Sequence, residues 1–599
     1  MFISMYRKAM PLTARKRLYR LRHQGFLRFL FSRKTKPLTH ARILQLEAKE
    51  HLARWELETA IHKAREATQL DPSLIGSYLI QIQILSSLGS IDEAKNLACS
   101  IKERFPLNVG LLRAMSALGL RFEPLSQTKI LCLASESHVP TDIIVSAMEY
   151  LYFYGEFERA LEIFDFGYVS AHTKISSSVR RNKRIANLIY WKAMCLEECG
   201  RLKEAIEVFT SLAPYKSHAQ KVHICIARCK FEAGDLDYAE SYLFLQHNKF
   251  LSDKFSPLYL DVLQALGRIK AAYELYRKRP ISVAISNFFA KPSSPNDINI
   301  LTCSDKKVLL ISEGGPGDEF RLSSTYDDLQ KLCGKVTITC DPRLTSIMRR
   351  TFPNIQFLPT TRHRREHAKP LADRSLITDA RLFQCVSDDV VAEARQNEVV
   401  CSLLDTFADI RPDRASFRIN NRTHLKPDSQ RSACWATVLG SGLNIGVAWR
   451  SMLMSVARSK HYFSPQDLKP LSELEGASIW SLQPSATAGE IRELRELIDL
   501  KEPFDLNLID DFESQIAFIS KLDYVISPFT TTGELAGSIG VKTFLISSAR
   551  NTRWRREKDG SDLFSPSCII LVQQGNTVCE LIQQAVNIIK EQEGTKIYL

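Results

Sequence analysis

The sequence predicts an α + α/β fold class: an α-helical solenoid followed by two doubly wound α/β lobes. Two observations predict it. Glycines recur at a spacing near 34 residues in the first half, and short apolar runs alternate with helical patterns in the second half. The 599 residues allow about three or four domains. We divide the chain into residues 1–40, a basic segment; 41–285, the helical repeats; 300–430, the first α/β lobe; and 440–595, the second α/β lobe.

The composition is that of a soluble globular protein, with 45% hydrophobic and 25% charged residues. No apolar run approaches the ~20 residues that a membrane-spanning helix needs. The 14 cysteines are scattered and form no Cys-x-x-Cys pair, which argues against a metal site and fits a reducing compartment. We therefore expect a cytoplasmic protein.

The net charge of +13 comes from one end of the chain. Residues 1–46 hold twelve Lys and Arg and no acid, whereas 68 basic and 67 acidic residues follow. Leu and Phe interleave with the cations, so residues 1–36 are expected to lie peripherally on an anionic membrane surface, as at the inner membrane. A solvated tail and a transit peptide stay open as alternatives. Nucleic-acid binding is not expected, because the cations occupy one terminal segment without a recognisable fold.

The repeats carry a Gly that is followed five residues later by Ala. A unit near Trp55 has the same spacing without its Gly, and a degenerate unit lies near Gly119. Gly permits the tight turn between two helices, and Ala lets them pack closely. Such a solenoid offers a concave face to a protein partner. The five pairs are Gly89/Ala94, Gly155/Ala160, Gly200/Ala205, Gly234/Ala239 and Gly267/Ala272.

The second half contains two series of short buried strands separated by turns and helical patterns. Strands that alternate with helices predict parallel sheets, here two Rossmann-like lobes that face one another across a cleft. The first series is 308–312, 336–340 and 355–358. The second series is 445–449, 478–482, 524–527, 543–546 and 569–572.

A threonine-rich corner lies between the strands 524–527 and 543–546. Thr530, Thr531 and Thr532 stand where a helix begins, and Thr531 and Glu534 have the spacing of a capping box. Gly533 would let a ligand approach the backbone closely. A helix start at the carboxyl end of a parallel strand is a place to hold phosphate, and the alternative is an ordinary capped helix.

Four segments carry a resemblance: GGPGDEFRLSSTYDDL, TCDPRLTSIMRRTFPNIQFLP, IGVAWRSMLMSVARSKHYFSPQDLKPL and LIDDFESQIAFISKLDYVISPFTTTGELAGSIGVKTFLI. They resemble tetratricopeptide-repeat (TPR) proteins with a GT-B glycosyltransferase domain of the heptosyltransferase group (glycosyltransferase family 9), and more distantly O-GlcNAc transferases. The resemblance covers about residues 300–595 and the TPR-like repeats, and residues 360–435 match poorly. It implies a nucleotide-sugar donor, no cofactor, no metal, and a glycan, lipid-linked or protein acceptor, as in polysaccharide biosynthesis.

In the first lobe the resemblance points to Asp318. It implies that Asp318, after Gly317, is the general base that takes the proton from an acceptor hydroxyl, and that the neighbouring Glu319 or Glu313 can substitute. The alternative is that Asp318 caps the helix that follows.

In the second lobe the resemblance points to cations and to the corner. Arg450, Arg458 and Lys460 would neutralise the diphosphate leaving group, with Thr531, Thr532 and Gly533 beside it. Gln483 would meet the base or ribose, unless it only shapes a loop. These six residues and Gln483 form the predicted donor site.

One departure from the heptosyltransferase pattern supports a different function. That pattern has a D-T/S-G-x-x-H turn, whereas here the turn contains no Asp and Ala536 or Gly537 stands where His is expected. The alternative hypothesis is therefore a non-catalytic TPR scaffold with a degenerate GT-B domain.

Overall fold

The computed structural model spans residues 1–599 and forms two compact units, residues 1–84 and 85–599. It describes the chain except for the following ranges: 1–38, 54–55, 89, 106–107, 109, 112–113, 116–117, 119, 121–140, 173–178, 214–218, 247–255, 362–375, 378, 418–424, 453–460, 548–549, 574–575 and 597–599. The basic segment, Trp55, Gly89 and Gly119 thus lie outside the described residues.

The first unit contains a helix hairpin. Helix α3 (His40–Ala53) packs on α4 (Leu57–Leu70), and Ala60 of α4 is fully buried. The next helix, α5 (Ile75–Ser87), is bonded to α4 because Gln81 Nε2 donates to the carbonyl of Ala64 at 3.1 Å. The unit near Trp55 therefore has the hairpin geometry that its spacing predicts.

The second unit continues with helix hairpins whose turns confirm the glycine pattern. Gly155, Gly200, Gly234 and Gly267 all have positive φ, between 73° and 88°, where a side chain would be strained. The Ala of each pair is fully buried against the partner helix. The helices are α6 (Ile91–Ile101), α9 (Thr141–Tyr154), α10 (Phe157–His172), α11 (Val179–Glu198), α12 (Leu202–Leu212), α13 (Ala219–Ala233), α14 (Leu236–Gln246), α15 (Pro257–Ala265) and α16 (Ile269–Tyr276).

The first lobe is built on a four-stranded parallel sheet of order β3-β2-β1-β4. Its strands are β1 (Lys307–Ile311), β2 (Lys335–Cys340), β3 (Gln356–Pro359) and β4 (Val399–Ser402). Its helices include α18 (Pro316–Leu322), α19 (Tyr326–Leu332), α20 (Thr345–Thr351), α21 (Asp388–Ala394) and α22 (Phe407–Ile410).

Both faces of this sheet are covered. Alternate residues of β1 point to opposite sides, so Val308 and Leu310 pack in the core with α19 and α20. Leu309 and Ile311 pack instead in a second core that contains Ala284 of α17 (Pro280–Phe289) and Val390 of α21. The helix that follows the last repeat hairpin therefore covers the first sheet.

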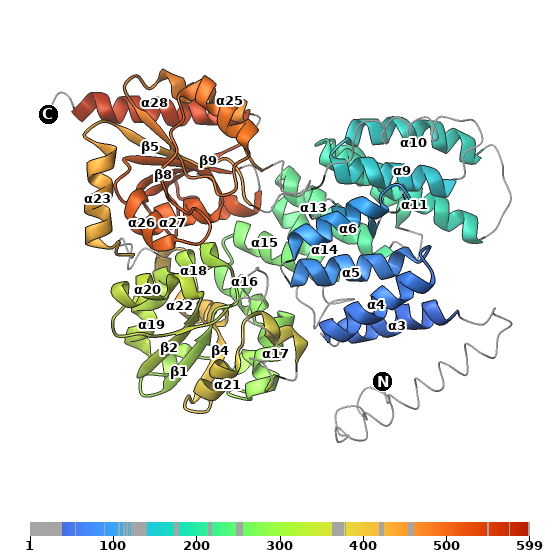
Figure 1. The fold of residues 1–599 in the computed structure, drawn as a ribbon, viewed down its shortest axis with the longest axis horizontal. Helices are drawn as coiled ribbons and strands as arrows, with labels where there is room; N and C mark the ends of the chain where they lie inside the picture. The colour runs from blue at the N-terminus through green and yellow to red at the C-terminus, as the bar shows by residue number, and fades with distance from the viewer. Residues whose placement is uncertain are drawn as a thin grey trace. The chain divides into compact units, whose positions relative to one another are not determined.

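The second lobe has a five-stranded parallel sheet of order β6-β5-β7-β8-β9. Helices α25 and α28 cover one face of this sheet, and α26 and α27 cover the other (Figure 1). Tyr524 and Ile526 of β7 pack in the core with α25 and α28, whereas Val525 packs in the core with α26 and α27. The strands are β5 (Asn444–Val447), β6 (Ser478–Ser481), β7 (Tyr524–Pro528), β8 (Lys542–Ser547) and β9 (Cys568–Val572). The helices are α23 (Ser429–Leu439), α25 (Ala488–Ile498), α26 (Phe512–Ile519), α27 (Thr531–Ile539) and α28 (Val578–Lys596).

This architecture confirms the predicted α + α/β fold class of a TPR-like solenoid and two Rossmann-like lobes, the GT-B type. Each of the eight predicted strands is present within one or two residues of its expected ends. The strand β4 has no counterpart among the predicted strands. In the described ranges, no helix is long and apolar enough to cross a membrane.

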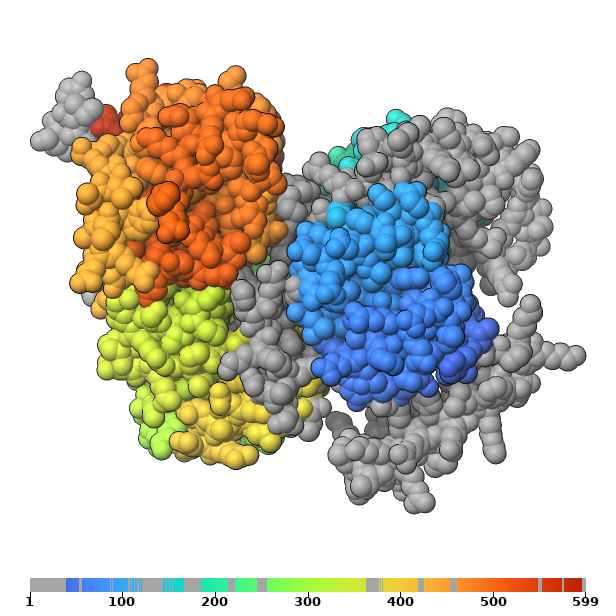
Figure 2. Space-filling model, in the orientation of Figure 1, coloured from blue at the N-terminus to red at the C-terminus, as the bar shows by residue number. Residues whose placement is uncertain are grey.

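Ion pairs and aromatic contacts join the two lobes. Arg343 of the first lobe pairs with Asp510 of the second at 3.0 Å, and Arg350 pairs with Glu513 at 2.7 Å. Figure 2 shows the green and yellow surface of the first lobe meeting the orange surface of the second along a continuous seam. The last repeat helix is bonded to the first lobe as well, because Arg277 donates to the carbonyl of Asp405 at 2.9 Å.

Candidate functional site

The two sheets place their topological switch points at one cavity. In a doubly wound sheet, ligands bind beyond the carboxyl ends of the strands where the strand order reverses. In the second lobe this point lies between β5 and β7, which are followed by Ser451 and Thr530. In the first lobe it lies between β1 and β4, which are followed by Gly317 and Leu404. All four residues line a single cavity of about 520 Å³.

At the threonine corner, helix α27 begins beside this cavity, and its N-cap residue provides no side-chain cap. Thr530 is the N-cap residue of α27, but its side chain makes no capping hydrogen bond and instead lies 3.0 Å from the hydroxyl of Ser527. The predicted capping box of Thr531 and Glu534 is wrong, because the Glu534 carboxylate pairs with Arg555. Among the described residues, no side chain therefore caps the first N–H groups of α27, which suits a helix start that binds an anion.

Two of the corner residues line the cavity, and two pack inside the second lobe. Thr530 and Thr531 line the cavity. Thr532 is 8% exposed and packs inside the lobe. A Cβ on Gly533 would lie 2.6 Å from Cδ2 of Leu545, so the small residue serves close packing of α27 on β8. This packing accounts for the glycine, and the approach of a ligand to Gly533 stays a prediction.

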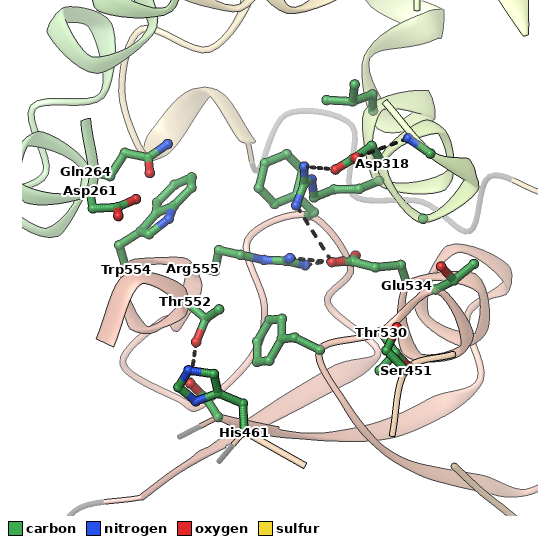
Figure 3. Close-up of a pocket in the computed structure, with 18 of the residues that line it drawn as sticks. Asp261, Gln264, Asp318, Ser451, His461, Thr530, Glu534, Thr552, Trp554 and Arg555 are labelled. Carbon is green, nitrogen blue, oxygen red and sulfur yellow. Dashed lines mark hydrogen bonds and ion pairs between the residues drawn. The ribbon is translucent and has the colours of Figure 1, made fainter. Parts of the chain in front are cut away.

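A buried ion network forms the floor of the cavity. Arg555, 4% exposed at its side chain, donates to Glu534 at 2.5 Å (Figure 3). It also donates to Asp562 at 2.8 Å. Arg321, at the surface of the cavity, lies 3.9 Å from Glu534. Burial alone would raise the pKa of Glu534, but the attraction of Arg555 and then of Arg321 lowers it. Glu534 is therefore charged, and the network is held in one arrangement.

Asp318 both caps its helix and lines the cavity. Its Oδ2 accepts a hydrogen bond from the N–H of Gly315 at 3.3 Å, and its Oδ1 accepts one from Arg321 at 2.6 Å. The side chain is 45% exposed. The structure thus contains the capping contact of the alternative interpretation, and the carboxylate also lines the cavity. The role of Asp318 as general base stays a prediction.

Glu319 does not reach the cavity. It is fully buried, and its carboxylate accepts from the backbone N–H of Asp341 at 3.1 Å and 3.2 Å. This carboxylate fixes the end of β2 to α18. The prediction that Glu319 can substitute for Asp318 as a base is therefore wrong, because its carboxylate does not line the cavity.

Arg450 and Gln483 shape the loop after β5 instead of facing the cavity. The Arg450 guanidinium donates to both carboxylate oxygens of Glu490 at 2.7 Å and is 11% exposed. Burial opposes the charge of Glu490, yet the bonds from Arg450 and Thr487 lower its pKa to about 2. Gln483 accepts from the N–H groups of Trp449 and Arg450 at 2.9 Å and 2.8 Å.

These contacts correct two sequence interpretations. The guanidinium of Arg450 is paired with Glu490, so the predicted role as the leading diphosphate cation does not match its position. The contacts of Gln483 match the interpretation that it shapes a loop. They do not match the predicted contact with a nucleotide base or ribose. Arg458 and Lys460 lie outside the described residues.

Several lining residues are not among the predicted site residues. His461 and Tyr462 follow β5, Thr552 and Trp554 follow β8, and the imidazole of His461 points toward Thr552 (Figure 3). Asp261, from the last repeat hairpin, also lines the cavity. The sequence signal near His461 and Tyr462 is the neighbouring cations. The sequence of a repeat helix contains no signal that one of its residues lines a cavity.

No metal centre is formed by the described part of the chain, where no three His, Cys, Asp or Glu side chains are grouped to hold an ion. The expectation of a reaction without metal or cofactor stays a prediction. Apart from the paired Glu534 and Arg555, the described lining groups that can take part in chemistry are the carboxylates of Asp261 and Asp318, the imidazole of His461, the guanidinium of Arg321 and the start of α27.

Comparisons with known proteins give similarity without a family assignment. No protein-family model matches the chain. Protein FlbA of Caulobacter vibrioides is 26% identical over 309 residues, which are 49% of this chain and 48% of FlbA, so the chain spans about half the length of this curated relative. A glycosyl transferase family 9 structure from Veillonella parvula has a TM-score of 0.35 and 11% identity, covering 49% of this chain and 99% of its own. A point mutant of the Thermobaculum terrenum O-GlcNAc transferase has a TM-score of 0.30 and 13% identity, covering 92% of this chain and 90% of its own.

Proposed function

We propose that the protein is a glycosyltransferase that moves a sugar from a nucleotide-sugar donor to a hydroxyl group of a glycan, lipid-linked or protein acceptor. One observation carries the proposal: the switch points of both sheets and the uncapped start of α27 open into the same cavity. A cavity of about 520 Å³ is within the usual size of a small-ligand site.

The donor diphosphate binds at the start of α27 in this proposal. The N–H groups of the first helical turn and the hydroxyl of Thr531 donate to phosphate oxygens, and the helix dipole favours their negative charge. His461, Tyr462 and Thr552 lie on the second-lobe side and contact the nucleoside. The repeats recruit a protein partner, and residues 1–36 keep this cytoplasmic protein near an anionic membrane surface.

The leaving group gains charge as its bond to the sugar breaks. Donors that are fixed in a site of low water content stabilise such charge without reorganisation. Arg321 and Arg555 both line the cavity, and the side chain of Arg321 is 27% exposed. Arg555 is held by Glu534 and Asp562, so its part is to fix the floor. Asp318 and Asp261 are the two carboxylates available to take the acceptor proton.

The proposal is tested by donor turnover. The full chain is incubated with UDP-, GDP-, CDP- and ADP-sugars, with and without EDTA, and the released nucleoside diphosphate is measured. We expect one donor class to be hydrolysed slowly, with water as the acceptor, equally in both conditions. Release that stops with EDTA contradicts the metal-free mechanism. If no donor is hydrolysed and no nucleoside diphosphate binds at millimolar concentration, the non-catalytic scaffold is the correct function.

A further inference from the structure

The last repeat hairpin contributes a carboxylate and an amide to the cavity. Asp261 and Gln264 are three residues apart on α15, so they share one face of the helix. Both line the cavity that the two lobes form, and α15 packs on the 3₁₀ turn η11 (Arg550–Arg555) that carries Trp554 (Figure 3). The repeats therefore form one wall of the candidate active site.

The surroundings of Asp261 favour its neutral form. The neighbouring Val262 and Leu263 are buried, and Asp261 is itself half-buried. Burial, and then the negative charge of Glu232 on α13, raise the pKa of Asp261 to about 7. No cation among the described residues pairs with its carboxylate. Tyr276 of α16 lines the same cavity. Burial raises the pKa of its phenol, Arg279 and Arg321 oppose the rise, and Asp318 and then Asp261 add to it.

Asp318 is less available as a base, because both of its carboxylate oxygens already accept hydrogen bonds. Arg321 lies 2.6 Å from Oδ1 of Asp318, and the N–H of Gly315 lies 3.3 Å from Oδ2. Each oxygen keeps a further lone pair, but the ion pair with Arg321 already balances the negative charge of this carboxylate. A general base works best when its pKa lies near the pH at which the reaction runs, a condition that Asp261 meets.

Resting on the glycosyl transfer proposed above, we propose that Asp261 is the general base, and that α15 of the repeats, with Gln264 beside it, binds the acceptor hydroxyl. The acceptor oxygen forms a bond to the anomeric carbon. The bond from that carbon to the diphosphate oxygen breaks, and its electron pair leaves with the nucleoside diphosphate. The hydroxyl proton goes to the carboxylate of Asp261. The acceptor then approaches along the repeats.

The test is a pH profile of donor hydrolysis by the full chain, with water as the acceptor and the donor class identified by release of nucleoside diphosphate. The hydrolysis rate of wild type should fall at acidic pH, and this acidic limb of the profile should have an apparent pKa near that of Asp261. Asp261→Asn should lower kcat at pH 8 at least about 100-fold and abolish the limb, with little change in donor KM. Glu232→Gln should shift the limb to lower pH, which a merely structural role of Asp261 would not produce.

Two further variants separate the outcomes. Asp237→Asn makes the same chemical change at an exposed position of α14 and should leave the profile unchanged. If Asp261→Asn keeps both kcat and the limb while Asp318→Asn loses them, Asp318 is the base and the inference is overturned. If wild type hydrolyses no donor, the proposed function itself fails. Nucleoside diphosphate binding by Asp261→Asn, measured by calorimetry, shows that a loss of kcat does not come from misfolding.

Discussion

Gly317 and Thr531 touch across the two lobes. A Cβ on Gly317 would lie 3.1 Å from Oγ1 and 3.2 Å from Cα of Thr531, so the first turns of α18 and α27 meet without a side chain between them. This contact keeps the Asp318 turn and the threonine corner at one cavity. The absence of a side chain at Gly317 therefore sets the separation of the two lobes at the site.

Replacing Gly317 should open this junction. Gly317→Val adds a branched side chain where a single Cβ is already tight, and overpacking of this kind costs about 1–3 kcal/mol. We expect a lower melting temperature and weaker nucleotide binding. Gly315→Ala is the control for stability, because a Cβ there meets nothing within 4 Å. Equal melting temperatures for the two variants would contradict the close contact.

The hydroxyl of Thr531 should contribute to nucleotide affinity. Removing one hydrogen bond to a charged group costs about 1.5–3 kcal/mol, so Thr531→Val should weaken nucleoside diphosphate binding at least about tenfold. Thr437→Val, on the exposed face of α23, makes the same change away from the cavity and should bind as wild type does. Calorimetric titration measures both. Unchanged affinity in Thr531→Val would place the diphosphate elsewhere.

The buried network under the cavity should be costly to break. Arg555→Met leaves the carboxylates of Glu534 and Asp562 without their cation, and such a change costs about 3–5 kcal/mol. Arg495→Met breaks an exposed pair with Glu502, where about 1 kcal/mol or less is expected. Urea unfolding followed by fluorescence compares the two. A small loss of unfolding free energy in Arg555→Met would contradict this expectation and would mean that water reaches the ion network at the floor of the cavity.

The raised pKa of Asp261 should make its site destabilising at high pH. The folded pKa is about 7, above the ordinary value of 3.8. The folded state therefore binds the proton more tightly, and the resulting stability is present below pH 4 and lost as pH rises through 7. Asp261→Asn removes this dependence, so its stability relative to wild type should improve by about 2 kcal/mol from pH 4 to pH 8, after discounting for solvent screening. A difference that stays constant with pH would contradict the raised pKa.

The sequence predicted the fold well because its signals are local. A Gly with an Ala five residues later marks the hairpins at Gly155, Gly200, Gly234 and Gly267, where the Gly has positive φ and the Ala is buried, and an apolar run marks each predicted strand. β4 was missed, and its four residues, Val399–Ser402, lie within residues 360–435, where the resemblance is poor. Periodicity and turn signals thus determine which elements form.

The site was predicted less well because its contacts are not local. Arg450 follows a strand as expected, but its guanidinium pairs with Glu490, which lies 40 residues away in the sequence. Asp261 looks like an ordinary residue of a repeat helix until the fold brings α15 to the cavity. Which charged group is paired and which one faces a cavity depends on partners far along the chain.

The central claim is that the cavity between the two sheets binds a nucleoside diphosphate. Calorimetric titration of the full chain with UDP, GDP, CDP and ADP tests it most directly. The account predicts that one nucleotide binds at a single site, and that a concentration of 100 times its Kd stabilises the protein by about 2.7 kcal/mol. No heat of binding from any of the four at millimolar concentration would contradict it.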